Sequence, residues 1–121
     1  MKPEKNLHPR SRLRSIGYSI EGCIQLVKLE PNAKIHALAT VAVIIAGVIR
    51  KVGKYDWIAL VFAIGLVWMT EALNTTIEML CDLWCKGEYH PKVKIIKDIA
   101  SAAVWIASMV SVAIAVFVFF F

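Results

Sequence analysis

The sequence predicts an all-α membrane protein, with an N-terminal amphipathic surface helix followed by three transmembrane helices. Of its 121 residues, 59% are hydrophobic, which exceeds the usual apolar share of a soluble domain. A soluble fold of this size has too little interior to hide so many apolar side chains. The length predicts a single domain over 1–121, with a basic N-terminus and surface helix at 1–34 and a three-span bundle at 35–121.

The first predicted element is the surface helix. Ile16, Ile20, Ile24 and Val27 recur at intervals of four, four and three, which places them on one helical face. The surrounding sequence is basic, as is typical of a helix lying on the anionic headgroups of the inner leaflet. Packing of this stripe against the spans is the alternative. Because the rest of the chain belongs in lipid, we expect no nucleic-acid partner.

Three apolar stretches predict the spans. They cover 35–49, 57–69 with an amphipathic continuation to about 84, and 99–121. A span takes roughly 20 residues, so the first two helices must recruit polar flanks to cross the bilayer. Polar groups then lie at membrane depth, where each needs a partner.

Two short connectors, at 50–56 and 86–94, join the spans. We expect Gly53 to be the turn residue of the first connector. In the second, Gly87 suits the end of the preceding helix, and Pro91 suits the first turn of the next one.

The distribution of Lys and Arg predicts the orientation. Residues 1–34 carry seven, the first connector three, the segment 86–97 four, and the C-terminus none. A cytoplasmic N-terminus and second connector give eleven basic residues inside against three outside. The positive-inside rule therefore predicts three spans with the N-terminus in the cytoplasm and the C-terminus outside.

Polar residues line one face of the second long helix. Glu71, Asn74, Glu78 and Asp82 follow a spacing of i, i+3, i+7 and i+11. A purely structural role for these side chains is hydrogen bonding between helices. However, two carboxylates stripped of water repel each other unless a cation or a proton intervenes. A bound Mg²⁺ and a glutamate acting as general base both suit this face.

The third helix carries the opposite charge just before its apolar run. Lys94, Lys97, Asp98 and Ser101 share one face, and we expect Lys97 to pair with a phosphate or a carboxylate. The sequence contains no Walker motif and no protein-kinase motif set. The residues by themselves therefore indicate a polar site at the cytoplasmic side, and a cation-transport or membrane-assembly subunit remains an alternative to an enzyme.

Two motifs resemble the prokaryotic diacylglycerol kinase family, which includes undecaprenol kinases. They are "EALNTTIEMLCDL" at 71–83 and "EYHPKVKIIKDIASAAV" at 88–104. "GYS" at 17–19 and Glu30 before "PNAKIH" also match. The resemblance implies a homotrimer in the bacterial inner membrane, with active sites shared between neighbours at the cytoplasmic interface. It also implies Mg²⁺-dependent transfer of the ATP γ-phosphoryl to the hydroxyl of a membrane lipid.

The resemblance further implies roles for individual residues. Glu71 would be the general base, Asn74 would hold it, and Asp98 would orient the site. Glu71 and Ser101 would contact the lipid substrate. Phosphoryl transfer depends mainly on positioning and charge neutralisation, and these residue types supply both.

The implied nucleotide site draws on residues from several helices. Glu30 and Glu78 would hold Mg²⁺ and, through it, the ATP phosphates. The residues implied to lie at the nucleotide are Arg12, Arg14, Tyr18, Glu30, Glu78, Asp82, Tyr89, His90 and Lys97. For the lipid, "NAKIH" and "HP" look like the undecaprenol branch and "EYH" and "SAAV" like the diacylglycerol branch. The N-terminal half favours undecaprenol.

Overall fold

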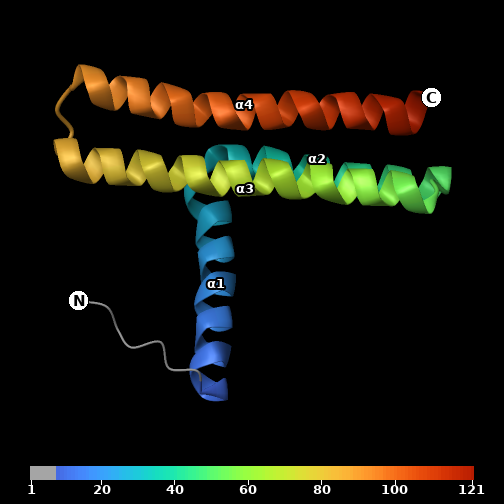
Figure 1. The fold of residues 1–121 in the computed structure, drawn as a ribbon, viewed down its shortest axis with the longest axis horizontal. Helices are drawn as coiled ribbons and strands as arrows, with labels where there is room; N and C mark the ends of the chain where they lie inside the picture. The colour runs from blue at the N-terminus through green and yellow to red at the C-terminus, as the bar shows by residue number, and fades with distance from the viewer. Residues whose placement is uncertain (1–7) are drawn as a thin grey trace.

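The chain forms four helices, three of which run lengthwise beside one another while the first runs crosswise (Figure 1). The computed structural model describes residues 8–121, so the part of the basic N-terminus at 1–7 lies outside the described residues. The helices are α1 (Pro9–Leu29), α2 (Pro31–Arg50), α3 (Lys54–Cys85) and α4 (Pro91–Phe120). Helices α2, α3 and α4 are long and apolar enough to cross a membrane. These features confirm the predicted all-α architecture with three candidate spans.

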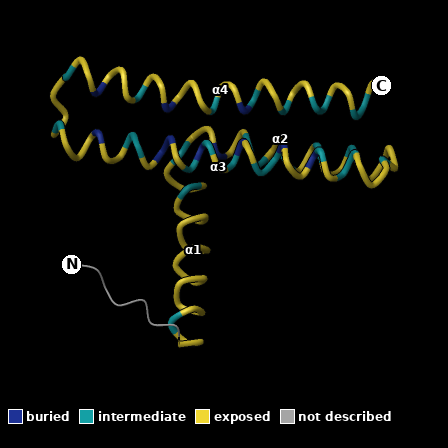
Figure 2. Tube along the Cα trace, viewed as in Figure 1, coloured by how far each residue is buried: buried dark blue, intermediate teal, exposed yellow. Residues whose placement is uncertain are grey.

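Helix α1 leaves its apolar stripe uncovered. Ile16, Ile20, Ile24 and Val27 are all exposed, and Figure 2 draws almost the whole helix in the colour of exposed residues. The stripe therefore does not pack against the spans of its own chain. Because α1 runs across the bundle (Figure 1), a bilayer crossed by the other three helices would hold α1 in the plane of its surface.

Glu30 makes the corner between α1 and α2. Its extended backbone (φ −99°, ψ 115°) ends α1 and begins α2, and its carboxylate accepts a hydrogen bond from the Asn32 backbone N–H at 3.4 Å. Pro31 follows as the first residue of α2, where its missing N–H costs no helical hydrogen bond. The corner therefore holds a carboxylate at the start of the first span.

The two connectors between the spans turn at residues in the left-handed conformation. In the first, this residue is Lys51 (φ 51°), whereas Gly53 is the N-cap of α3 with φ −73°; the turn is therefore made at Lys51 and not at the expected Gly53. In the second, Lys86 (φ 51°) and Gly87 (φ 82°) both adopt positive φ, so the prediction for Gly87 is confirmed. Pro91 begins α4, also as predicted.

Helices α3 and α4 pack closely along their length because small residues line the contact. Ala63 on α3 and Ala100 and Ala107 on α4 are buried, and small side chains let helix backbones approach closely. Ser111 Oγ donates to the carbonyl oxygens of Ala63 (3.0 Å) and Ala107 (2.8 Å) and so joins the two helices. The large apolar side chains point outward instead, as expected of a surface that meets lipid or other subunits.

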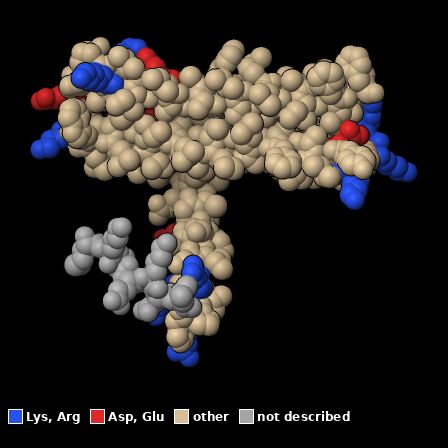
Figure 3. All heavy atoms as spheres, in the orientation of Figure 1, with Lys and Arg blue, Asp and Glu red and all other residues tan. Residues whose placement is uncertain are grey.

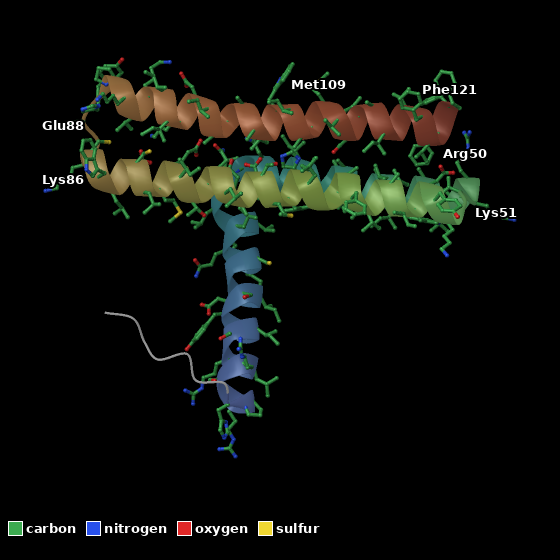
Figure 4. All side chains as sticks on the ribbon, in the orientation of Figure 1. Arg50, Lys51, Lys86, Glu88, Met109 and Phe121 are labelled. Carbon is green, nitrogen blue, oxygen red and sulfur yellow. The ribbon has the colours of Figure 1, made fainter. Side chains whose placement is uncertain are left out.

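The unequal lengths of the helices set the depth of the polar residues. The 20 residues of α2 extend about 30 Å and the 32 residues of α3 about 48 Å. Arg50 and Lys51 lie near the C-terminal end of α4, where Arg50 Nη2 donates to the Phe119 carbonyl oxygen at 2.8 Å (Figure 4). Helix α3 therefore outreaches α2 at the opposite end, where its last turns and the start of α4 pass the level of α1 (Figure 1).

Charged side chains gather at the two ends of the bundle and along α1 (Figure 3). On the visible face, the middle of the bundle carries none of them. Lys86 and Glu88 mark the end formed by the α3–α4 connector (Figure 4). This distribution matches a bilayer that covers the middle of the three long helices.

The contact between Gly47 and Trp57 gives a test of the packing. A Cβ added at Gly47 would lie 2.7 Å from the indole ring of Trp57. We expect Gly47→Ala to destabilise the protein by about 1–3 kcal/mol, because overpacking forces side chains and backbone to shift. Thermal unfolding in detergent measures this. Gly65→Ala is the matched control, since nothing lies within 4 Å of a Cβ there; equal losses in both variants would contradict the packing.

The asymmetry of the basic residues predicts the topology. A reporter fused after Phe121 should lie outside the cytoplasm, and one inserted at 86–91 should lie inside, because the segments rich in Lys and Arg remain in the cytoplasm. Accessibility labelling of both fusions in intact cells measures this. A cytoplasmic C-terminal reporter would reverse the orientation.

Candidate functional site

Glu71 is the most deeply buried polar residue of the described chain. It lies in the middle of α3 with an exposed fraction of 0%. Its Oε2 lies 3.1 Å from Nε2 of His36 on α2, whereas its Oε1 is buried and has no hydrogen-bond partner among residues 8–121. A buried carboxylate oxygen without a partner carries a desolvation cost. The site therefore holds an acceptor that is ready for a donor from a ligand.

The imidazole of His36 is held in place from two sides. Its ring meets the Trp68 ring edge-on, with centroids 6.3 Å apart. Trp68 Nε1 in turn donates to Thr40 Oγ1 at 3.0 Å, and Thr40 Oγ1 donates to the His36 carbonyl oxygen at 2.7 Å. The hydrogen bond to Glu71 is therefore part of a network that joins α2 to α3.

Two further contacts follow along the same face of α3. Asn74 Nδ2 donates to Glu78 Oε1 at 3.4 Å, and Thr75 Oγ1 donates to Glu30 Oε2 at 3.2 Å. Glu30 is thereby joined to α3 four residues along from Glu71, and Glu78 lies seven residues along the same helix. Three carboxylates are thus gathered where α1, α2 and α3 meet, and they repel one another unless a cation or a proton intervenes.

A pocket of about 230 Å³ opens at Glu71. Its polar lining consists of Asn32, His36, Glu71, Asn74, Ser101 and Ser108. An apolar cavity of about 280 Å³ lies deeper between α2, α3 and α4 and shares His36 and Ser108 with this pocket. The polar pocket therefore brings together three predicted site residues, Glu71, Asn74 and Ser101, at the head of an apolar cavity.

Asp82 and Lys97 form the outer part of the polar face. Lys97 Nζ donates to Asp82 Oδ1 at 2.5 Å across α3 and α4, so the predicted carboxylate partner of Lys97 is Asp82. Asp98 pairs instead with Lys94 of its own helix, at 2.7 Å, and does not line the pocket at Glu71. By helical rise, Asp82 lies about 16 Å along α3 from Glu71.

Tyr89 and His90 lie in the connector between α3 and α4. They line a separate pocket of about 280 Å³ with Trp84, Cys85, Lys86 and Glu88. His90 also begins α4, because its Nδ1 accepts from the Lys92 backbone N–H at 3.2 Å, and its ring meets that of Trp84 edge-on.

Arg12, Arg14 and Tyr18 are not brought to this site within one chain. All three lie on α1 and are exposed, Tyr18 to 70%. Helix α1 runs away from the bundle (Figure 1).

The donor atoms suit a hard cation that takes only some of its ligands from the protein. No group of three His, Cys, Asp or Glu side chains within residues 8–121 is placed to hold a metal ion. Mg²⁺ needs fewer, because it prefers one or two carboxylates together with substrate phosphates and waters. Glu30 and Glu78 supply two carboxylates, and the buried Asn74 Oδ1, which has no partner in the described chain, is a further oxygen donor. These residues fit a magnesium ion that reaches the site with a nucleotide.

His36 and Thr75, which provide the contacts of Glu71 and Glu30, are not among the residues that the sequence predicts for the site. A signal for His36 was present, because a titratable side chain inside the first apolar stretch needs a partner at membrane depth. Which partner it finds depends on the register between α2 and α3, and the sequence does not give that register.

Comparison with known proteins relates the chain to lipid kinases. The family model "Prokaryotic diacylglycerol kinase" matches residues 17–119. The chain is 31% identical to an undecaprenol kinase of Bacillus subtilis over 106 residues, which cover 88% of this chain and 85% of that protein. It is 33% identical over 100 residues to a diacylglycerol kinase of Synechocystis, covering 83% of this chain and 57% of that protein. The matched family segment includes every predicted site residue except Arg12 and Arg14.

Proposed function

The chain belongs to the prokaryotic diacylglycerol kinase family, and we propose that it transfers the γ-phosphoryl group of ATP to the hydroxyl of a membrane lipid alcohol at the cytoplasmic interface. Membership of this family makes the protein a lipid kinase that uses ATP. This activity takes the place of the two alternatives, a cation-transport subunit and a membrane-assembly subunit. The assignment of the reaction centre rests on the burial of Glu71, one of whose carboxylate oxygens has no partner within the described part of the chain.

Glu71 is proposed as the general base. The lipid hydroxyl gives its proton to Glu71 Oε1 while its oxygen forms a bond to the γ-phosphorus, and the bond between that phosphorus and the bridging oxygen of ADP breaks. A base within hydrogen-bond reach of the hydroxyl is the first requirement. Asn74 and Ser101 line the same pocket and are proposed to orient the base and the lipid.

The nucleotide is proposed to lie farther out along α3, where the polar face continues beyond the level of α2. Glu30 and Glu78 would hold Mg²⁺, which neutralises phosphate charge during transfer. Lys97 is proposed to contact phosphates, with Asp98 orienting this part of the site. Asp82, Tyr89 and His90 would border the nucleotide from the α3–α4 end.

A homotrimer with shared sites is proposed for the assembly. Arg12, Arg14 and Tyr18 are exposed on α1, which runs away from the bundle, so we propose that they contact the nucleotide at the site of a neighbouring subunit. The many exposed large apolar side chains of α2, α3 and α4 leave ample surface for such contacts as well as for lipid.

Undecaprenol is proposed as the preferred lipid, with diacylglycerol as the alternative. The relative named undecaprenol kinase matches over 85% of its own length, and the one named diacylglycerol kinase over 57%. The deciding experiment supplies purified protein with labelled ATP and each lipid in parallel, and identifies the phosphorylated product. Label in undecaprenyl phosphate supports the proposal, and label only in phosphatidate would assign the diacylglycerol activity instead.

Removal of the proposed base tests its role. Glu71→Gln keeps the size of the side chain but cannot accept the proton, so we expect kcat to fall by about 10²–10⁴-fold, with far less change in the KM for ATP. Kinetics over a range of ATP and lipid concentrations measure both.

Thr70→Val is the matched control for Glu71→Gln. The Thr70 hydroxyl donates to the Leu66 and Val67 carbonyl oxygens of its own helix, so this variant should keep wild-type turnover. If Glu71→Gln turned over normally but lost ATP binding, Glu71 would belong to the nucleotide site, and Asp98 would be the next candidate base.

The magnesium assignment is tested at Glu78. Glu78→Gln removes one negative charge that the cation needs, so we expect the apparent affinities for Mg²⁺ and ATP to fall together, by about tenfold or more (roughly 1.4 kcal/mol or more). Titration of activity with Mg²⁺ at fixed ATP measures this. Asp56→Asn makes the same chemical change in the first turn of the same helix and should leave the titration unchanged. An unchanged Mg²⁺ dependence in Glu78→Gln would remove Glu78 from the metal site.

A further inference from the structure

The two oxygens of the Glu71 carboxylate have different surroundings. Oε2 lies 3.1 Å from His36 Nε2, whereas Oε1 is buried without a partner among the described residues. Glu71 lines the polar pocket and has no exposed surface, so the carboxylate is held at one oxygen and left available at the other. A base that is itself oriented by a third group is a recurring arrangement in active sites.

We propose that His36 is a positioning residue that donates its Nε2–H to Glu71 Oε2 and thereby directs Oε1 toward the lipid hydroxyl. The inference rests on the proposed function of Glu71 as general base. It adds a residue on a second helix that sets which carboxylate oxygen accepts the proton.

The required tautomer follows from the chemistry of the base. Glu71 must be ionised to accept a proton, and an ionised carboxylate only accepts hydrogen bonds. The short contact therefore requires a proton on Nε2 of His36. A hydrogen bond donated to an ionised carboxylate favours its charged form, so the Nε2–H of His36 supports Glu71 as a base.

The surroundings of His36 suit a positioning role. The Trp68 ring meets the imidazole edge-on, and its indole N–H donates to Thr40, so Trp68 is itself held in place before any ligand binds. The ring is 17% exposed and lies where the polar pocket meets the apolar cavity. A lipid whose tail fills the apolar cavity would bring its hydroxyl to the level of this hydrogen bond.

The test compares two substitutions at His36 in the full-length protein. His36→Leu removes the donor, whereas His36→Gln keeps an N–H donor near the position of Nε2. We expect His36→Leu to lower kcat by about 10–100-fold, as for loss of a hydrogen bond to a charged group, with little change in the KM for ATP. His36→Gln should recover to within about threefold of wild type. In a Glu71→Gln background, His36→Leu should change the residual rate by less than about twofold, because residues that act as a unit are non-additive.

Several outcomes would overturn the positioning role while the kinase function stands. They are normal turnover in His36→Leu, equal loss in His36→Leu and His36→Gln, and a further large loss from His36→Leu in the Glu71→Gln background. The last two would indicate a purely structural contact. Wild-type protein without any lipid-dependent use of ATP would instead overturn the proposed function itself, and this inference with it.

A spectroscopic measurement on wild-type protein is independent of turnover. In protein with ¹⁵N-labelled histidine, we expect the His36 resonance to show a protonated Nε2 at the working pH and to shift in Glu71→Gln. The His8 and His90 resonances serve as internal controls. An unprotonated Nε2 at His36 would overturn the proposal.

Discussion

A carboxylate at membrane depth costs several kcal/mol unless it has partners, and the arrangement of the helices around Glu71 meets this requirement. The start of α2 supplies His36, whose imidazole meets the Glu71 carboxyl and packs edge-on against Trp68. The carboxyl is fully buried, and a polar pocket lined by Ser101 and Ser108 of α4 lies beside it. One oxygen has a partner, and the other has none among residues 8–121, which is the condition expected of an acceptor that awaits a substrate.

The difference in length between α2 and α3 separates two chemical environments along one helix. Glu71 lies beside the first turns of α2, where an apolar cavity begins, and Asp82 lies about 16 Å farther along α3, in a part of the bundle that α2 does not reach. A lipid hydroxyl arriving from the bilayer and a nucleotide arriving from water can therefore approach the same helical face from opposite directions. The corner at Glu30 sets the boundary, because its contact with Thr75 joins the end of α1 to α3.

Three of the residues that we propose to bind the nucleotide lie on α1, away from the polar face of α3 in the same chain. Arg12, Arg14 and Tyr18 are carried by a helix that extends crosswise from the bundle, and its apolar stripe is uncovered. An isolated helix of this kind gains its stability from a membrane surface or from neighbouring subunits. The same feature explains the exposure of α1, and it is the reason for proposing a second subunit at the nucleotide site.

The sequence by itself determined the three spans, the surface helix and the polar face of the second long helix, because hydrophobic periodicity and residue spacing are local properties. The motifs around Glu71 and Lys97 also identified the family. Only the tertiary structure decided which polar groups meet: Lys97 pairs with Asp82 and not with its neighbour Asp98, and Glu71 pairs with His36, 35 residues earlier. These pairings depend on the register and rotation of each helix against the next, which follow from the packing of side chains across the whole bundle and not from spacing along one helix.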